Sequence, residues 1–206
     1  MKISKIEIQK TNPDRVNIYC DNKFYCGIDV EVYYSLKLSK GSEITDEIKA
    51  EIDKQNALSK CYRKAVSLLN YRDRTSFELR KKLKEKLFDE KEINWAITKL
   101  ENEGYVNDNN FLETYITYYK DSLSKLKITQ KLWQMGIPLD LIRDKLNQYF
   151  NDETDEYKAC LLVMEAKIRY TKMEREKLFR HLLYKGFTYN TVTKVLNDHF
   201  PKDDGG

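Results

Sequence analysis

The chain has few of the residues that interrupt regular structure, and it has no long apolar run. Its 206 residues include only seven glycines and three prolines, which excludes collagen-like and loop-dominated architectures. Apolar runs such as residues 159–164 are far too short to cross a bilayer, and no basic flank followed by a hydrophobic segment opens the chain. We therefore expect a cytoplasmic protein with no membrane partner.

Residues that usually carry catalysis or bind metals are also scarce. The two histidines, His181 and His199, have no Cys or Ser nearby in a recognisable nucleophile motif, and no Gly-rich phosphate loop is present. No two of the four cysteines are separated by the short interval of a zinc or redox site. The sequence therefore predicts no catalytic residue, no metal site, no cofactor and no enzymatic activity.

Residues 1–50 are predicted to form a small β-rich extension with one short helix. Apolar and polar residues alternate in two stretches, Ile6–Ile8 and Val16–Ile18, with the period of two that is typical of strands. This pattern predicts an antiparallel hairpin or meander. A short helix at residues 29–36 and a charged connector helix at residues 45–54 are expected to follow.

One hairpin of this extension decides where two cysteines point. If residues 21–22 form a two-residue turn, Cys20 faces Lys23 across the ladder. Cys26 then faces Asn17, on the opposite side of the sheet. A disulfide between these two cysteines is therefore not expected.

The rest of the chain contains an internal repeat of about 50 residues, in which a helix with apolar residues at i and i+4 leads into a turn and a second apolar helix. The equivalent positions are Leu79, Leu83, Phe88, Ile93 and Ile97, then Ile128, Leu132, Ile137, Ile142 and Leu146, then Leu178, Leu182, Phe187, Val192 and Leu196. The amphipathic segments that precede them are Ala57–Asn70, Asp108–Asp121 and Glu153–Arg169. The sequence therefore predicts a mainly α protein, an elongated array of three tandem three-helix repeats at residues 51–106, 107–151 and 152–200, before a tail at 201–206.

Local signals support the helix limits of this array. Thr75–Glu78 and Thr171–Glu174 both have the spacing of a capping box, which predicts a helix start at each. Gly136 and Gly186 occupy the positions where a middle helix must end, and Pro138 suits the first turn of the helix that follows.

The first repeat is strongly basic. Between residues 57 and 91, eleven basic residues oppose five acidic ones. Seven of the basic residues form the candidate binding site for phosphate or for an acidic protein: Arg72, Arg74, Arg80, Lys81, Lys82, Lys84 and Lys86. The competing interpretation is a solvated helix face on which Glu78 and Glu85 pair with neighbouring lysines.

Tyrosine is unusually abundant, with fifteen residues. Tyr115, Tyr118 and Tyr119 cluster on the first helix of the second repeat. Tyrosine suits protein interfaces because it combines apolar area with a hydroxyl group, so these three residues are candidate interface aromatics. Aromatic residues at helical spacing are also typical of a core, and the sequence leaves both interpretations open.

Two binding functions compete for the array. The turn between the second and third helices resembles a helix-turn-helix, which would make each third helix a reader of DNA sequence. The three third helices together carry five basic and six acidic residues, and a negative surface would repel the phosphates that line a groove. A protein-binding array is therefore favoured, and a tandem helix-turn-helix DNA-binding protein is the alternative.

The sequence also resembles the RecX regulators of the bacterial RecA recombinase along essentially its whole length. The residues that carry the resemblance are Ala65, Leu69, Arg72 to Ser76, Glu78-Leu79, Lys82-Leu83, Gly104 to Asp108, Phe111, Leu132 to Ile137, Leu182, Lys185 to Thr188 and Val192. Two positions depart from the family pattern. Leu87 stands where the first repeat usually has Gly, and Leu112 stands where Ala is typical.

The resemblance implies a function as well as a fold. It implies a helical array that lies in the groove of the RecA–DNA filament and restrains the recombinase and ATPase activities of RecA in recombination and repair. It implies no catalysis by this chain. We expect a monomer that binds DNA only weakly and without sequence specificity.

Overall fold

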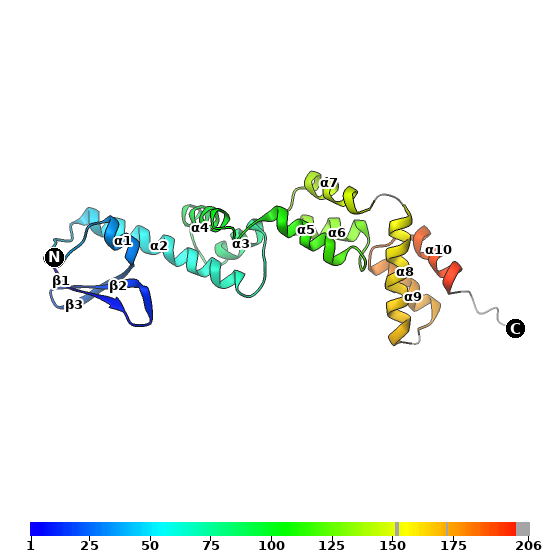
Figure 1. Cartoon of the computed structure of the whole chain (residues 1–206), viewed down its shortest axis with the longest axis horizontal. Coiled ribbons are helices and arrows are strands. Elements are labelled where there is room, and N and C mark those ends of the chain that lie inside the picture. Colours follow the sequence, from blue (N-terminus) through cyan, green and yellow to red (C-terminus); the bar gives the residue numbers. More distant parts are fainter. Residues whose placement is uncertain (151–152, 172, 201–206) are drawn as a thin grey trace. The chain divides into compact units, whose positions relative to one another are not determined.

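The computed structural model describes residues 1–150, 153–171 and 173–200. The chain forms two compact units, one built from residues 1–72 and 79–105 and the other from residues 73–78 and those from 106 onward. In the part of the chain that the structure describes, a small sheet is followed by helices alone (Figure 1). The predicted class, mainly α with an N-terminal antiparallel sheet, is confirmed.

Three antiparallel strands form this sheet in the order β1-β2-β3, namely β1 (Ile3–Gln9), β2 (Asn12–Cys20) and β3 (Lys23–Asp29). Asp21 and Asn22 connect β2 to β3 with positive φ angles of 49° and 62°, which a two-residue type I′ turn requires. The predicted meander and its tight turn are therefore confirmed. Helix α1 (Val30–Ser35) follows directly, as expected.

The predicted position of Cys26 in the sheet is wrong by one residue. The register shifts between Ile18 and Tyr19, so Cys26 pairs with Ile18 and not with Asn17. A bulge adds one residue to a strand, and a shift of one residue turns the following side chains to the other face. Cys20 and Cys26 therefore share one face of the sheet. Both are free thiols.

Helix α2 (Asp46–Leu69) is one continuous helix where the sequence predicted two. No Gly or Pro separates the predicted connector helix from the first helix of the repeat, so nothing ends the helix between them. Ile52 is fully buried and packs in the core of the sheet. The predicted limit between residues 50 and 51 falls inside this helix, which the β-rich extension and the first repeat share.

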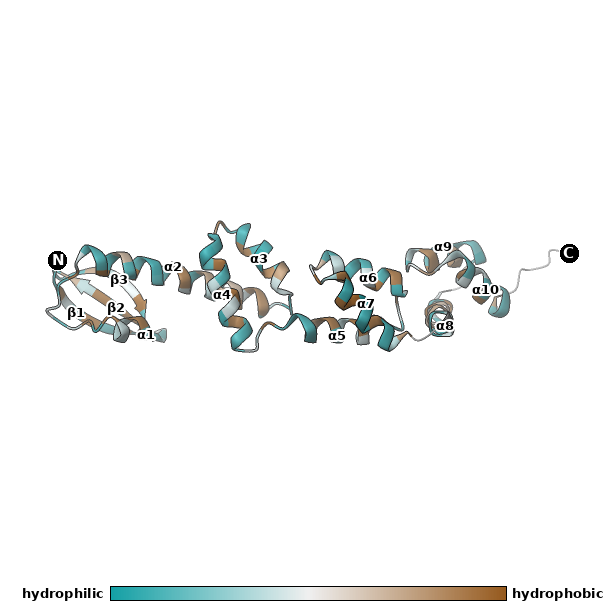
Figure 2. Ribbon diagram, turned by 90° about the horizontal axis from the view of Figure 1, so that it is seen from above, coloured by the Kyte–Doolittle hydropathy of each residue, from teal (hydrophilic) through white to brown (hydrophobic). Residues whose placement is uncertain are grey.

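Eight further helices follow in the order that the repeat predicts. They are α3 (Ser76–Lys84), α4 (Glu90–Asn102), α5 (Asp108–Tyr119), α6 (Lys125–Gln134), α7 (Leu139–Tyr149), α8 (Glu153–Tyr170), α9 (Arg175–Tyr184) and α10 (Tyr189–His199). All fifteen equivalent apolar positions are buried except Phe88, which is half-buried. Hydrophobic and hydrophilic residues alternate along these helices (Figure 2), as expected for helices with one buried face. The three-helix repeat is thus confirmed at the level of its core.

The predicted helix starts are correct at one site and wrong at another. Thr75 and Glu78 form the predicted capping box, with Thr75 Oγ1 accepting from Glu78 N at 3.2 Å and Glu78 accepting from Thr75 N at 3.4 Å. The predicted box at Thr171 does not form, because Glu174 is itself the residue before α9 and makes no capping hydrogen bond with its side chain.

The turns that end the three middle helices all require a left-handed residue. Gly136 and Gly186 have φ angles of 86° and 92°, as the sequence predicts for the ends of these helices. At the equivalent position of the first repeat, Leu87 has a φ of 63° and is 94% exposed. The turn is therefore conserved in shape even where glycine is absent.

A contact that recurs in the second unit, here called the repeat joint, uses these glycine turns. Thr75 Oγ1 donates to the carbonyl oxygen of Met135 at 2.6 Å, and Ser124 N donates to the carbonyl oxygen of Lys185 at 3.2 Å. Thr75 and Ser124 are equivalent residues in successive repeats, and both are fully buried. Each joint therefore places the start of one middle helix on the end of the next.

Glycine is needed at the joint for space as well as for its backbone conformation. A Cβ atom on Gly136 would lie 2.2 Å from Cγ of Phe77, and one on Gly186 would lie 2.5 Å from Oγ of Ser124. No side chain fits at such distances unless the neighbouring residue shifts. The two glycines therefore lie where Phe77 and Ser124 of the preceding repeat occupy the space that a Cβ atom would need.

Candidate functional site

Three of the seven cations in the predicted basic run form ion pairs with the nearby carboxylates of Glu85 and Glu90. Arg80 and Lys84 both form ion pairs with Glu90, at 3.0 and 2.9 Å, and Lys82 pairs with Glu85 at 2.7 Å. Arg80 is half-buried and the other four groups are exposed, and ion pairs at such positions contribute little to stability. For these three cations the structure thus supports the competing interpretation, a solvated and paired helix face.

The other predicted cations differ in their surroundings. Arg72 is exposed and Arg74 is half-buried, in the segment that leads to α3. Lys81 and Lys86 are exposed and form no ion pair with any residue that the structure describes. Lys81 and Lys86 are therefore the members of the run that keep an uncompensated charge.

Three further cations lie beside Lys86, and the sequence analysis did not select them. Lys60, Arg63 and Lys64 on α2 line a surface hollow together with Ser67, Lys86 and Phe88, the last two from the turn between α3 and α4. The volume of the hollow is about 420 Å³. The signal that identifies these α2 residues is their spacing of i, i+3, i+4 and i+7, which places all of them on one helix face.

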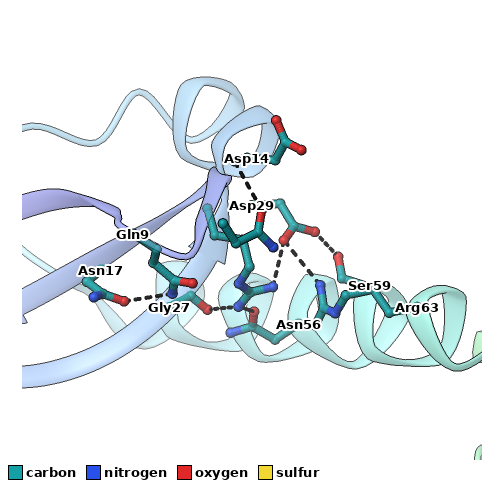
Figure 3. A network of polar contacts seen from close by, with 10 residues as sticks. Gln9, Asp14, Asn17, Gly27, Asp29, Asn56, Ser59 and Arg63 are labelled. Carbon is teal, nitrogen blue, oxygen red and sulfur yellow. Dashed lines mark hydrogen bonds and ion pairs between the residues drawn. The ribbon is translucent and has the colours of Figure 1, made fainter. Parts of the chain in front are cut away.

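A polar network attaches this face of α2 to the sheet and holds Arg63 in place (Figure 3). The carboxylate of Asp29, at the end of β3, accepts from Arg15 at 2.6 Å, from Arg63 at 3.3 Å and from the Ser59 hydroxyl. Arg15 also donates to the carbonyl oxygen of Gly27 at 2.6 Å. Burial, and then the nearby charge of Arg15, lower the pKa of Arg63, while Asp29 acts in the opposite direction.

The chemistry of this surface is that of anion binding. Lys60, Lys64 and Lys86 form no ion pair with the described residues, so their ammonium groups are available to an external anion. Burial raises the pKa of the Cys61 thiol to about 11, which keeps it protonated near neutral pH. Across residues 1–150, 153–171 and 173–200, His, Cys, Asp and Glu nowhere form a group of three that could hold a metal ion.

The candidate interface aromatics occupy two different environments on α5. Tyr115 and Tyr119 are half-buried against the core of the second repeat, with ring centroids 4.5 Å apart. Burial, and then the neighbouring Tyr119, raise the pKa of Tyr115 to about 12. Tyr118 is 76% exposed and contacts Tyr119 edge-on at 4.8 Å. Tyr118 therefore presents the largest free ring of the three.

Two family models match the chain. The model described as the regulatory protein RecX N-terminal domain matches residues 1–45, which hold the sheet and α1. The model described as RecX, first three-helix domain matches residues 61–100, which run from within α2 into α4. No helix in the described ranges is both long and apolar enough for a membrane crossing.

Comparisons over the whole chain agree with these matches. The regulatory protein RecX of Clostridioides difficile (strain 630) is 35% identical over 95% of this chain and 94% of its own length, and that of Bacillus pumilus (strain SAFR-032) is 32% identical over 96% and 77%. A crystal structure of regulatory protein RecX matches with a TM-score of 0.72 and 27% identity, covering 95% of this chain and 98% of that one. From the sheet through the third repeat, this chain belongs to the RecX family of regulatory proteins.

Proposed function

We propose that this chain binds in the groove of the RecA–DNA filament and lowers the recombinase and ATPase activities of RecA without catalysing a reaction itself. The observation that carries this proposal is the similarity to RecX regulators over 95% of the chain. The uncompensated lysines of the first repeat support it, because a filament that contains DNA is a polyanion. In this proposal the protein acts as a monomer in the cytoplasm.

The repeated construction suggests how one chain affects a polymer. Three modules in series offer several contact surfaces, and contacts that are linked on one chain strengthen one another through their effective concentration. Such a chain favours assembled RecA over free RecA, because only the polymer presents several sites at fixed spacing. Contacts to neighbouring subunits would also restrain the movements that accompany ATP hydrolysis.

The test is the rate of ATP hydrolysis by RecA from the same organism on single-stranded DNA, measured with increasing amounts of this protein. We expect the rate to fall, and the protein to co-sediment with RecA filaments and not with free RecA. No effect on this matched RecA would contradict the proposal.

Charge reversal of the two unpaired cations in the basic run tests the predicted site. Changing both Lys81 and Lys86 to Glu should weaken the inhibition and leave the helix folded, because neither residue has an ion pair to lose. Changing Lys40 and Lys49 to Glu is the matched control for net charge, because both are exposed and neither forms an ion pair with a described residue. Equal inhibition by the two double variants would show that Lys81 and Lys86 make no filament contact.

A further inference from the structure

The hollow between α2 and the α3–α4 turn is lined by several cations and by an aromatic residue. Four cationic side chains, from Lys60, Arg63, Lys64 and Lys86, surround it. Three of them are free of ion pairs with the described residues, and Arg63 shares Asp29 with Arg15. The nearest acidic neighbour of Lys86 along the chain, Glu85, is paired with Lys82. The hollow thus keeps a net positive charge.

An aromatic ring forms part of the same hollow. Phe88 is the counterpart of Ile137 and Phe187, which are only 2% and 3% exposed in the other repeats. Phe88 is half-buried, so part of its ring contributes to the surface that the four cations surround. Ser67 adds a hydroxyl group at the edge. The hollow therefore offers amines for phosphates and a ring face for a base.

We propose that this hollow binds single-stranded nucleic acid, with phosphates on Lys60, Lys64 and Lys86 and an unpaired base on Phe88. Basic grooves with aromatic rings are the general means by which proteins bind single strands without regard to sequence. A duplex keeps its bases stacked and cannot offer one to Phe88. An acidic peptide would use the amines but would gain nothing from the ring.

The shape of the hollow favours a strand over a free nucleotide. Lys60, Arg63 and Ser67 are exposed, so the hollow is open to solvent along α2. Small-molecule sites bury most of the surface of their ligand, and an open hollow does not. A strand needs contact on one side only. Lys60 and Ser67 are seven residues apart, which corresponds to about 10 Å along the helix and gives the strand a path parallel to α2.

The first experiment measures binding of a fluorescent oligothymidylate of about 15 nucleotides by anisotropy, with no RecA present. Changing both Lys60 and Lys64 to Gln should weaken binding roughly tenfold and lower the log–log salt slope by about 1.4, or about 0.7 for each lost phosphate contact. Changing Lys40 and Lys49 to Gln removes the same charge outside the hollow from two exposed lysines without an ion pair to a described residue, and should have little effect. Equal losses in the two double variants would overturn the proposal.

The second experiment tests the ring of Phe88 by changing the oligonucleotide and not the protein, so a folding defect in a variant cannot account for the result. An abasic oligonucleotide of the same length should bind the unaltered protein roughly fivefold to tenfold more weakly than oligothymidylate. This loss lies at the low end of the range for base–aromatic stacking, because Phe88 is half-buried. Phe88→Leu should bind both probes equally. Equal binding of both probes by the unaltered protein would overturn the role of Phe88.

Competition identifies the ligand class. A duplex of the same length, ATP and polyglutamate should each displace the labelled strand less effectively than unlabelled oligothymidylate. Displacement by ATP at the same nucleotide concentration would overturn the choice of a strand. Because none of these assays contains RecA, their failure would leave the proposed regulation of the filament intact, and failure of the ATPase test would leave this site intact.

Discussion

Replacing Leu87 by glycine should stabilise the first unit. The residue ends α3 with a φ of 63°, and it is 94% exposed, so its side chain contributes almost no packing. A left-handed conformation costs a residue with a Cβ atom about 1–2 kcal/mol. Glycine avoids this strain. It also raises the conformational entropy of the unfolded chain, which lowers the free energy of unfolding by about 0.4–1 kcal/mol. The difference predicts a net stabilisation of about 0.5–1 kcal/mol for Leu87→Gly.

The two tryptophans allow this effect to be measured in the correct unit. Trp95 lies on α4 in the first unit, and Trp133 lies on α6 in the second, where it is 60% exposed. In a Trp133→Phe background, urea unfolding followed by Trp95 fluorescence should show a higher midpoint for Leu87→Gly at an unchanged m-value. A lower midpoint would refute the reasoning, because it would mean that the leucine side chain makes a stabilising contact.

Gly136→Ala makes the reverse change at the equivalent turn of the second repeat, because it replaces a left-handed glycine by a residue with a side chain. It should destabilise the second unit by at least about 1–2 kcal/mol from the backbone conformation alone. The new Cβ atom would also lie 2.2 Å from Cγ of Phe77, which adds to the cost. Trp133 fluorescence in a Trp95→Phe background reports this loss. An unchanged midpoint would contradict the account of the glycine turn.

Two other parts of the second unit give predictions of different kinds. Thr75→Ala should lower the free energy of unfolding by roughly 2 kcal/mol, because it removes both a helix cap and a buried hydrogen bond. Ser124→Ala removes only the cap and should lower it by about 1 kcal/mol. Urea unfolding measures both losses. Equal losses would contradict this division. Burial, and then the charges of Lys167 and Lys185, lower the pKa of His181 below its ordinary value of 6.5. As the pH falls, the unfolded state therefore binds a proton at this histidine before the folded state does. The free energy of unfolding should decrease as the pH drops below 6.5. His181→Gln should reduce that loss in urea unfolding at a series of pH values, and an unchanged pH profile would refute the role of this histidine.

The helical repeat could be predicted from the sequence because its signals are local. The apolar residues of each repeat lie within about 20 positions of one another, and their spacing directly specifies the buried face of a helix. The same holds for the type I′ turn at Asp21 and Asn22. The bulge next to that turn could not be predicted, because a strand with one extra residue has the same alternating composition as a regular strand. A shift of one position therefore reversed the expected side of Cys26.

The candidate site was predicted only in part, because the sequence shows charge but not pairing. Arg80 and Lys84 appear in the sequence as members of a basic run, yet both reach Glu90 on the next helix. Lys60 and Lys64 are separated from Lys86 by more than 20 residues, and only the fold brings them to the same hollow. Helical spacing on α2 shows that these lysines share a face, but it does not show what that face meets.

The repeat joint also explains which residue types stand at the three equivalent turns. The turns at Gly136 and Gly186 each receive the start of the preceding middle helix, and a Cβ atom at either glycine would lie 2.2 or 2.5 Å from Phe77 or Ser124. In the part of the chain that the structure describes, the turn of the first repeat has no such neighbour, so the side chain of Leu87 meets no steric conflict and is 94% exposed. Among the described residues, glycine therefore occurs at the turns that form a joint, and the turn without a joint tolerates a side chain at the cost of a left-handed backbone.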